Sequence, residues 1–160
     1  MRAMASEDTD AFLEIFSDPK VMQSFDGELF DRRQMEQWVQ RNLAHQEKYG
    51  YGLFSVILKE KNTLIGDCGL EHMVIDGHPE VELGYDIHSG YWNRGFATQA
   101  AGAVRDFAFQ ELQIPRLISL IRPANIASLR VSEKIGMAKE KEILRGEVTY
   151  WIYALSRDDR

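Results

Sequence analysis

Residues 81–98 read VELGYDIHSGYWNRGFAT, and this stretch decides the fold. Apolar and polar residues alternate over 81–87, which predicts a strand, and small and apolar residues at helical spacing follow Gly95. A strand, a glycine-containing loop and a helix together can hold a phosphate, because the first N–H groups of a helix lack intrahelical partners. The stretch therefore predicts either an anion-binding turn or an ordinary strand-to-helix turn.

The loop itself offers further features that suit an anion. Gly95 and Ala97 are small enough to let a ligand approach the backbone closely, and Arg94 would add a charge-assisted donor. The sequence contains neither a Walker loop nor a G-x-G-x-x-G fingerprint. Nucleoside triphosphate and NAD sites therefore lack their motifs.

Working outward, the pattern predicts helices on both sides of this stretch. Ser6 is expected to cap a first helix that Asp18-Pro19 ends, and a second helix is expected from about Asp31. Asn125 is expected to open a short helix that Gly136 closes. The remaining expected elements are strands over 53–58, 63–70, 116–121, 137–144 and 148–155, with turns at 59–62 and 76–79.

Composition limits the class of protein. The chain has 160 residues, 44% hydrophobic and 28% charged, and its net charge of −6 argues against a general binder of nucleic acid or anionic membranes. One cysteine, Cys68, excludes an internal disulfide framework. No signal peptide or membrane span is evident. We therefore expect a single α/β domain over residues 1–160 that is cytoplasmic and has no nucleic-acid or membrane partner.

Four motifs in order carry a resemblance to a known family. They are ELGYDI at 82–87, GFAT at 95–98, NIAS at 125–128 and EKIGM at 133–137. This set resembles the GCN5-related N-acetyltransferases, and within them the ribosomal-protein alanine N-acetyltransferases and their relatives that modify small molecules. The resemblance implies an α+β fold with a mixed, mostly antiparallel, splayed sheet flanked by about four helices. Only residues 1–5 precede the first expected helix, so the first edge strand should be short or missing, and a second chain, as in a homodimer, could cover that edge.

The resemblance also implies acetyl-CoA as co-substrate, bound in a V between the strands 81–87 and 116–121. Its pantetheine would pair with backbone near Tyr85 and Ile87 and contact Asn125 and Ser128. Its pyrophosphate would rest on the loop and first helical turn, at Asn93, Arg94, Gly95, Phe96, Ala97 and Thr98. The expected activity is transfer of the acetyl group to a primary amine by direct attack in a ternary complex.

Two groups could carry the proton chemistry. Glu82 matches the position where this branch often has a carboxylate that takes the amine proton through water, and apolar neighbours would raise its pKa. A salt-bridged, structural Glu82 is the equal alternative. Many members have a tyrosine near the CoA sulfur at the position of Ser132. The hydroxyl of Ser128 or Ser132 could donate to the sulfur directly or through water, but Ser132 is expected to face solvent or cap locally, and Ser128 to contact CoA.

The acceptor is less defined by the sequence. Acidic residues in the expected acceptor loops favour a cationic amine, and a weakly basic site suits an α-amine, such as that of a protein N-terminus. These residues are Asp26, Glu28, Asp76 and Glu80. His72, His78 and His88 match no ligand spacing, so no metal is expected. A non-catalytic acyl-CoA sensor and an interaction domain on the same fold remain alternatives.

Overall fold

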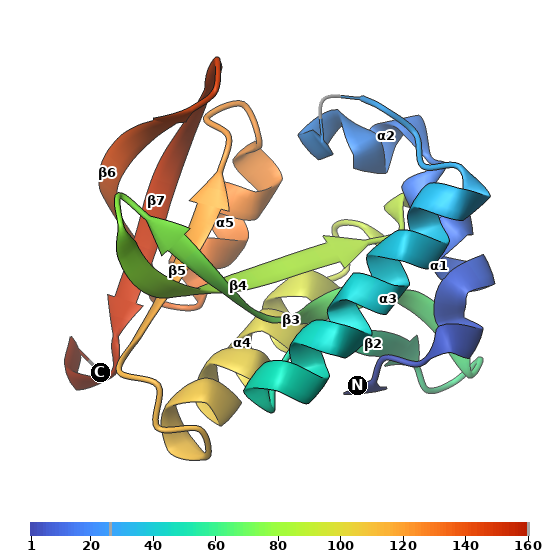
Figure 1. Ribbon diagram of the computed structural model, residues 1–160, viewed down its shortest axis with the longest axis horizontal. Helices are drawn as coiled ribbons and strands as arrows, with labels where there is room; N and C mark the ends of the chain where they lie inside the picture. The colour runs from blue at the N-terminus through green and yellow to red at the C-terminus, as the bar shows by residue number, and fades with distance from the viewer. Residues whose placement is uncertain (26, 160) are drawn as a thin grey trace.

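The computed structural model describes residues 1–25 and 27–159 and contains one seven-stranded sheet (Figure 1). The strand order is β1-β2-β3-β4-β5-β7-β6, and every neighbouring pair is antiparallel except β4 and β5, which are parallel. This confirms the expected mixed, mostly antiparallel sheet. The strands are β1 Arg2–Ala3, β2 Leu53–Leu58, β3 Thr63–Ile75, β4 His78–Ile87, β5 Arg116–Ile121, β6 Ala138–Arg145 and β7 Val148–Ser156.

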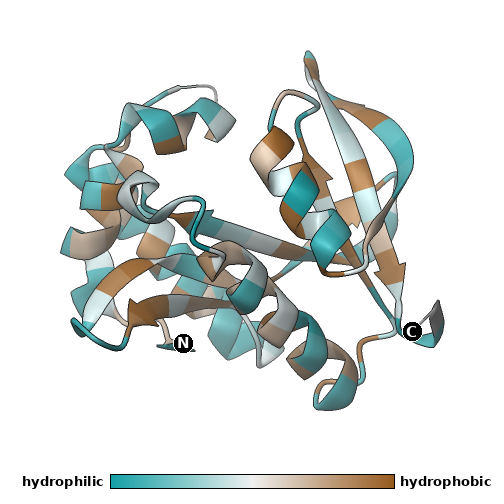
Figure 2. Cartoon of the chain, turned by 180° about the vertical axis from the view of Figure 1, so that it is seen from behind, coloured by the Kyte–Doolittle hydropathy of each residue, from teal (hydrophilic) through white to brown (hydrophobic). Residues whose placement is uncertain are grey.

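Helices cover both faces of the sheet. Helices α1 and α3 lie on one face (Figure 1), and α4 and α5 lie on the other, which Figure 2 shows from behind. The described residues contain five α-helices: α1 Thr9–Phe16, α2 Pro19–Met22, α3 Arg32–Tyr49, α4 Phe96–Gln110 and α5 Ile126–Lys134. Short 3-10 turns add η1 Ser6–Asp8, η2 Gln23–Phe25, η3 Ser89–Tyr91 and η4 Arg157–Asp159. No helix in this part of the chain has the length and apolar character needed to cross a membrane.

Helix α3 begins and ends where its terminal residues predict. The Asp31 carboxylate accepts from the Gln34 N–H at 2.7 Å, and the Gln34 side chain accepts from the Asp31 N–H at 2.8 Å. This reciprocal pair satisfies two donors at the helix start. Gly50, at φ 75°, follows the last turn in the left-handed conformation that favours glycine. The boundary expected near Asp31 is confirmed.

The first helix starts differently from the prediction. Ser6 lies inside the 3-10 turn η1 rather than capping a helix, and its hydroxyl bonds to Glu7. Asp8 caps this turn instead, because its carboxylate accepts from the Ala5 N–H at 3.0 Å. Asp8 is buried and also binds Arg2 of β1 and Ser55 of β2. This contact holds the expected short edge strand, which pairs with β2 over two residues.

Strands β3 and β4 are longer than the hydrophobic pattern indicated. They pair without interruption over ten positions and meet in a two-residue turn at Asp76 and Gly77, both with positive φ. On one face Cys68, Leu70 and Leu83 pack in the core against α4. On the other face lie polar residues and glycines of both strands: Asp67, Gly69, Glu71, Glu82, Gly84 and Asp86.

The two parallel strands β4 and β5 form the V that the resemblance implied. They share one register pair, Glu82 with Ile118, and from there they diverge (Figure 1). The Glu82 carboxylate accepts from the Leu120 N–H of β5 at 3.1 Å, so its side chain spans the vertex. The sheet therefore opens beside the C-terminal half of β4, where the next loop and α4 begin.

Candidate active site

The loop after β4 presents free backbone donors at the start of α4. Gly95 precedes the helix with φ 82°, and the described residues provide no side-chain cap there. The first intrahelical bond runs from the Gln99 N–H to the Gly95 carbonyl, at 2.9 Å. The N–H groups of Phe96, Ala97 and Thr98 thus have no partner within the helix and carry the positive end of its dipole. This local geometry suits an anion.

A cavity of about 580 Å³ lies in the mouth of the V, in front of these donors. Strand β4, the loop, α5 and the α2–η2 segment each contribute to its wall. Nine residues predicted for the cofactor site line it: Tyr85, Ile87, Asn93, Gly95, Phe96, Ala97, Thr98, Asn125 and Ser128. Residues far apart in the sequence therefore converge on one cleft. Tyr85 and Ser128, for example, are 43 positions apart.

Two predicted residues stand apart from this wall. The Arg94 guanidinium stacks over the rings of Tyr91 and Phe96, 5.6 and 5.0 Å from their centres, and Arg94 is not among the lining residues. Glu82 lies at the vertex and is likewise not part of the lining. The positive charge on the wall comes from residues that sequence reasoning missed: Lys20, Arg122, Arg130 and Lys134. The four-residue spacing of Arg130 and Lys134 on one helix could have indicated a shared face.

Tyr85 ties β4 to α5 across the cavity. Its hydroxyl donates to the Ser128 carbonyl at 2.8 Å and lies 3.1 Å from the Ser132 hydroxyl. Ser132 is fully buried, so the expectation that it faces solvent or caps locally is wrong. The reason is that the Tyr85 ring reaches α5 from the opposite strand and covers Ser132. Where many family members place a tyrosine, this chain has a buried Ser132 bonded to Tyr85.

Asn125 has a structural role and a second contact. Its side-chain oxygen accepts from the Ser128 N–H at 3.1 Å and so caps α5. Its amide nitrogen donates to the Ser24 hydroxyl of η2 at 3.0 Å. At the other end of the same segment, the Ser89 hydroxyl donates to the Asp18 carboxylate. The α2–η2 segment is therefore attached at one end to Asn125, which lines the cavity, and at the other end to η3, whose Tyr91 lines it.

Three carboxyl groups on the polar face of β3 and β4 have raised pKa values. Burial raises the pKa of Glu82 to about 7, against the opposing effect of the Leu120 N–H bond. Burial and the negative charge of Glu71 raise the pKa of Asp86, which lines the cavity, to about 7. Burial and the charge of Asp86 raise the pKa of Asp67 well above its ordinary value. Groups that titrate near neutral pH can exchange protons with an amine.

Two of the four acidic loop residues are held in ion pairs. Glu80 pairs with Arg116 at 3.2 Å, and Asp76 pairs with Lys141 at 2.8 Å. Glu28 is exposed on its loop, and Asp26 lies outside the described residues. Among the described residues that line the cavity, the carboxylate is that of Asp86 on β4.

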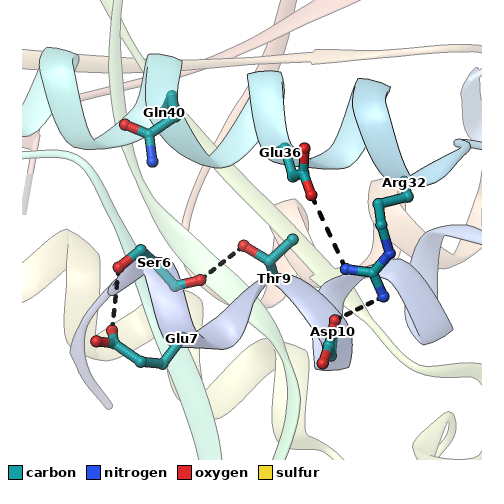
Figure 3. A pocket seen from close by; sticks show the side chains of 7 residues that line it. All are labelled: Ser6, Glu7, Thr9, Asp10, Arg32, Glu36 and Gln40. Carbon is teal, nitrogen blue, oxygen red and sulfur yellow. Dashed lines mark hydrogen bonds and ion pairs between the residues drawn. The ribbon is translucent and has the colours of Figure 1, made fainter.

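A second hollow, of about 350 Å³, lies between α1 and α3 (Figure 3). Its polar side chains pair with one another: Arg32 lies 2.8 Å from Asp10 and 4.0 Å from Glu36 (Figure 3). Such exposed pairs are typical of a solvated helix surface. The cavity at the V is therefore the better candidate for chemistry.

The other candidate groups lie outside this cavity. Cys68 is buried in the core, and burial raises the pKa of its thiol well above the ordinary value. The His72 N–H donates to a ring nitrogen of His45, and His88 accepts from the Gly90 N–H. Among residues 1–25 and 27–159, no three His, Cys, Asp or Glu side chains gather in a way that could hold a metal ion.

Sequence comparison places the chain among the acetyltransferases. Residues 1–138 match the model of the acetyltransferase (GNAT) domain. The chain is 35% identical over 156 residues to the uncharacterized protein YkkB of Bacillus subtilis, covering 96% of this chain and 90% of that protein. It is 32% identical over 143 residues to the uncharacterized N-acetyltransferase YnaD of the same organism, covering 88% and 79%.

Solved structures share the fold. A GNAT-family acetyltransferase from Bacillus anthracis superposes with a TM-score of 0.83 at 29% identity, covering 98% of this chain and 93% of that one. RimL, a ribosomal L7/L12 α-N-protein acetyltransferase solved with coenzyme A, superposes with a TM-score of 0.81 at 16% identity, covering 97% and 92%. At that identity the likeness concerns the fold alone. The splayed β4–β5 pair, the uncapped start of α4 and the family match agree, and the chain belongs to the GNAT acetyltransferases as an N-acetyltransferase.

Proposed function

We propose that the protein transfers the acetyl group of acetyl-CoA to a primary amine, either on a small molecule or at a protein N-terminus, by direct attack in a ternary complex. One observation carries the proposal. The cavity of the V joins free helix N–H donors at one end to a carboxylate-bearing strand at the other. A polyanionic thioester and an amine can therefore meet in one cleft.

The proposed cofactor site uses the residues gathered on the wall. The N–H groups of Phe96, Ala97 and Thr98 would bind the pyrophosphate, and Arg130 and Lys134 add positive charge to the same cavity. Asn125 and Ser128 would contact the pantetheine arm, which extends along β4 toward the vertex. RimL, which shares the fold, is known with coenzyme A bound. Since the net charge of the chain is −6, this local attraction must act against the overall field.

The proposed reaction needs a neutral amine. Glu82, with a pKa of about 7, would take a proton from the acceptor ammonium, directly or through water. The amine nitrogen then attacks the thioester carbonyl carbon, and the C–S bond breaks to release the CoA thiolate. A thiol with a pKa near 8.5 is a tolerable leaving group, so a weak donor such as the Ser128 hydroxyl is sufficient. The products are the amide, coenzyme A and one proton.

Cofactor binding is tested by titration calorimetry with acetyl-CoA. Gly95→Glu should weaken binding by more than about tenfold, because its carboxylate would stand at the anion site. Gly95→Ala is the matched control, since it imposes the same positive-φ strain without a charge. Equal affinity in all three proteins would contradict the cleft assignment.

Turnover is tested by thiol release against a panel of amines and peptide N-termini. Glu82→Gln should lower kcat by about 10²-fold or more while leaving acetyl-CoA affinity nearly unchanged. An unchanged rate in Glu82→Gln between pH 6 and pH 9 would exclude Glu82 as the base. Tight acetyl-CoA binding without thiol release on any amine would favour an acyl-CoA sensor.

A further inference from the structure

The acceptor-facing side of β3 and β4 holds two pairs of carboxylates with a gap between them. Asp67 is the cross-strand partner of Asp86, and Glu71 is the partner of Glu82. Between these pairs lie Gly69 and Gly84, so no side chain fills the middle of this face. Pairs four residues apart on a strand are separated by roughly 13 Å.

The Asp67–Asp86 pair is not neutralised by the described residues. Asp67 is 1% exposed, and neither of its carboxyl oxygens has a hydrogen-bond partner. Within residues 1–25 and 27–159, no hydrogen bond or cation acts on the Asp86 carboxyl, although Lys20 lines the same cavity. The Glu71–Glu82 pair differs, because each of its carboxyls is near a positive charge. The charge of Arg41 lowers the pKa of Glu71, and that of Arg145 lowers the pKa of Glu82, each against the larger effect of burial. A buried carboxyl without a partner is costly to stability, so its retention points to a ligand.

The space on the β4 side of the gap is open to such a ligand. A Cβ built on Gly84 would meet no atom within 4 Å and Gly84 is partly exposed, whereas Gly69 is buried beneath the backbone of Gly52 and Leu53. Asp86 lines the main cavity, so this floor is continuous with the proposed acetyl-CoA cleft. An aliphatic chain can therefore pass over Gly84 from one carboxylate pair to the other.

We propose that the acceptor is a linear aliphatic amine with a second ammonium group, which the Asp67–Asp86 pair binds while the reacting amine lies beside Glu82. This inference rests on the proposed function, which assigns the amine beside Glu82 as the one that is acetylated. The second ammonium donates to Asp86, and Asp67, the cross-strand partner of Asp86, stands behind it as a positioning residue. The alkyl chain lies over Gly84.

The test measures equilibrium binding of three amines by calorimetry, in the presence of desulfo-CoA. Diaminooctane spans the two pairs, diaminobutane is too short, and octylamine lacks the second ammonium. We expect diaminooctane to bind about tenfold or more tightly than the other two, as a charged hydrogen bond to a buried carboxylate allows. Equal affinity for diaminooctane and octylamine would overturn the proposal.

Substitutions test which residues cause the tighter binding of diaminooctane than of octylamine. Asp86→Asn and Asp67→Asn should each reduce the affinity for diaminooctane to the level of octylamine, with octylamine binding unchanged and folding checked by thermal unfolding. Glu60→Gln, which removes the same charge from an exposed turn, should keep the preference. A preference that survives in both Asp variants would place the second ammonium elsewhere.

The outcome separates this inference from the proposed function. If diaminooctane binds preferentially but no amine releases thiol from acetyl-CoA, the second-cation site stands and the transferase proposal fails. If amines are acetylated with the same kcat/KM for diaminooctane and octylamine, the transferase stands and the second-cation site fails. Glu82→Gln should abolish turnover of diaminooctane while its binding persists.

Discussion

At the scale of single residues, the raised pKa that suits Glu82 to accept a proton also lowers the stability of the folded chain at neutral pH. Glu82 has a pKa of about 7 in the folded chain, above its ordinary value of 4.5. Between these two pH values the unfolded chain has lost the proton and the folded chain keeps it. The free energy of unfolding therefore falls as pH rises through this range and levels off above pH 7.

Replacing Glu82 by Gln should remove this pH-dependent loss. We expect Glu82→Gln to gain stability relative to the wild type as pH rises from 4.5 to 8, by up to about 3 kcal/mol. Urea unfolding at pH 5 and pH 8 measures the difference. The same stability difference between the two proteins at both pH values would contradict the raised pKa.

Asp8 has the opposite behaviour. Burial pushes its pKa up, but hydrogen bonds from Arg2, Ser55 and the Ala5 N–H outweigh that effect and hold the pKa below its ordinary value. Asp8 therefore stabilises the fold above its unfolded pKa, and this contribution is lost as pH falls toward the folded pKa.

Asp8→Asn should lower the free energy of unfolding at pH 7 by about 2 kcal/mol, because buried donors lose a charged acceptor. Asp10→Asn, two residues later in α1, is the matched control, since the Asp10 side chain is 80% exposed and pairs only with Arg32 among the described residues. Chemical denaturation compares the two. Equal effects would show that burial of Asp8 is not what matters.

At the scale of elements, one histidine completes the edge of β3. Strand β2 begins at Leu53 opposite Gly69, so the His72 N–H lies beyond its reach. His45 of α3 accepts that N–H at 2.9 Å, and its other ring nitrogen lies 3.0 Å from the Tyr51 carbonyl. Both contacts need a neutral ring with the proton on Nδ1. Burial, the largest cause, lowers the pKa of His45.

His45→Ala should cost about 1–2 kcal/mol at pH 7.5, because the His72 N–H loses its acceptor. The wild type loses this advantage as pH falls below the unfolded pKa of 6.5, because the unfolded ring gains a proton that the folded ring resists. Unfolding of both proteins at pH 7.5 and pH 5.5 measures this. An advantage that grows at pH 5.5 would contradict the neutral ring.

The sequence predicted elements well where local patterns determine them. The boundary at Asp31 and the helix between Asn125 and Gly136 follow from capping residues, strand 53–58 follows from a short apolar run, and all three are confirmed. The additional length of β3 and β4, residues 71–75 and 78–80, comes from pairing across the Asp76-Gly77 turn and not from a hydrophobic pattern within either strand. Ser6 was misassigned because the competing cap, Asp8, is selected by tertiary contacts with Arg2 and Ser55.

The sequence predicted the cavity residues that belong to motifs better than the charged residues that line the rest of the cavity. Gly95 and Asn125 come with motifs, whereas the charges of Lys20 and Arg122 reach the cavity from elements distant in the sequence. The partnerless state of Asp67 depends on cross-strand register, which one strand alone does not reveal. The contact of Tyr85 with Ser132 likewise needs both elements in place.

For the whole molecule, a ligand in the V should act as a stabiliser. Acetyl-CoA at 100 times its Kd adds about 2.7 kcal/mol, which for a chain of 160 residues raises the Tm by roughly 5–11 °C. The shift should shrink with added salt, because in the proposed complex the wall residues Arg130 and Lys134 would attract the phosphates. Thermal unfolding with acetyl-CoA at low and high salt measures both effects. A salt-independent shift would argue against phosphate recognition by these side chains.

The single register pair between β4 and β5 has a further consequence. Beyond Glu82 and Ile118 no further residue pair joins the two strands, although next to this pair Glu82 accepts from the Leu120 N–H and Ser119 donates to the Leu83 carbonyl. Unpaired strand edges can pair with an extended chain of another molecule, which is why many proteins protect their outer strands. We therefore expect the strand edges farther along the V to favour contacts between molecules when no ligand fills it. Coenzyme A in the storage buffer should therefore slow aggregation of concentrated samples, as light scattering can follow.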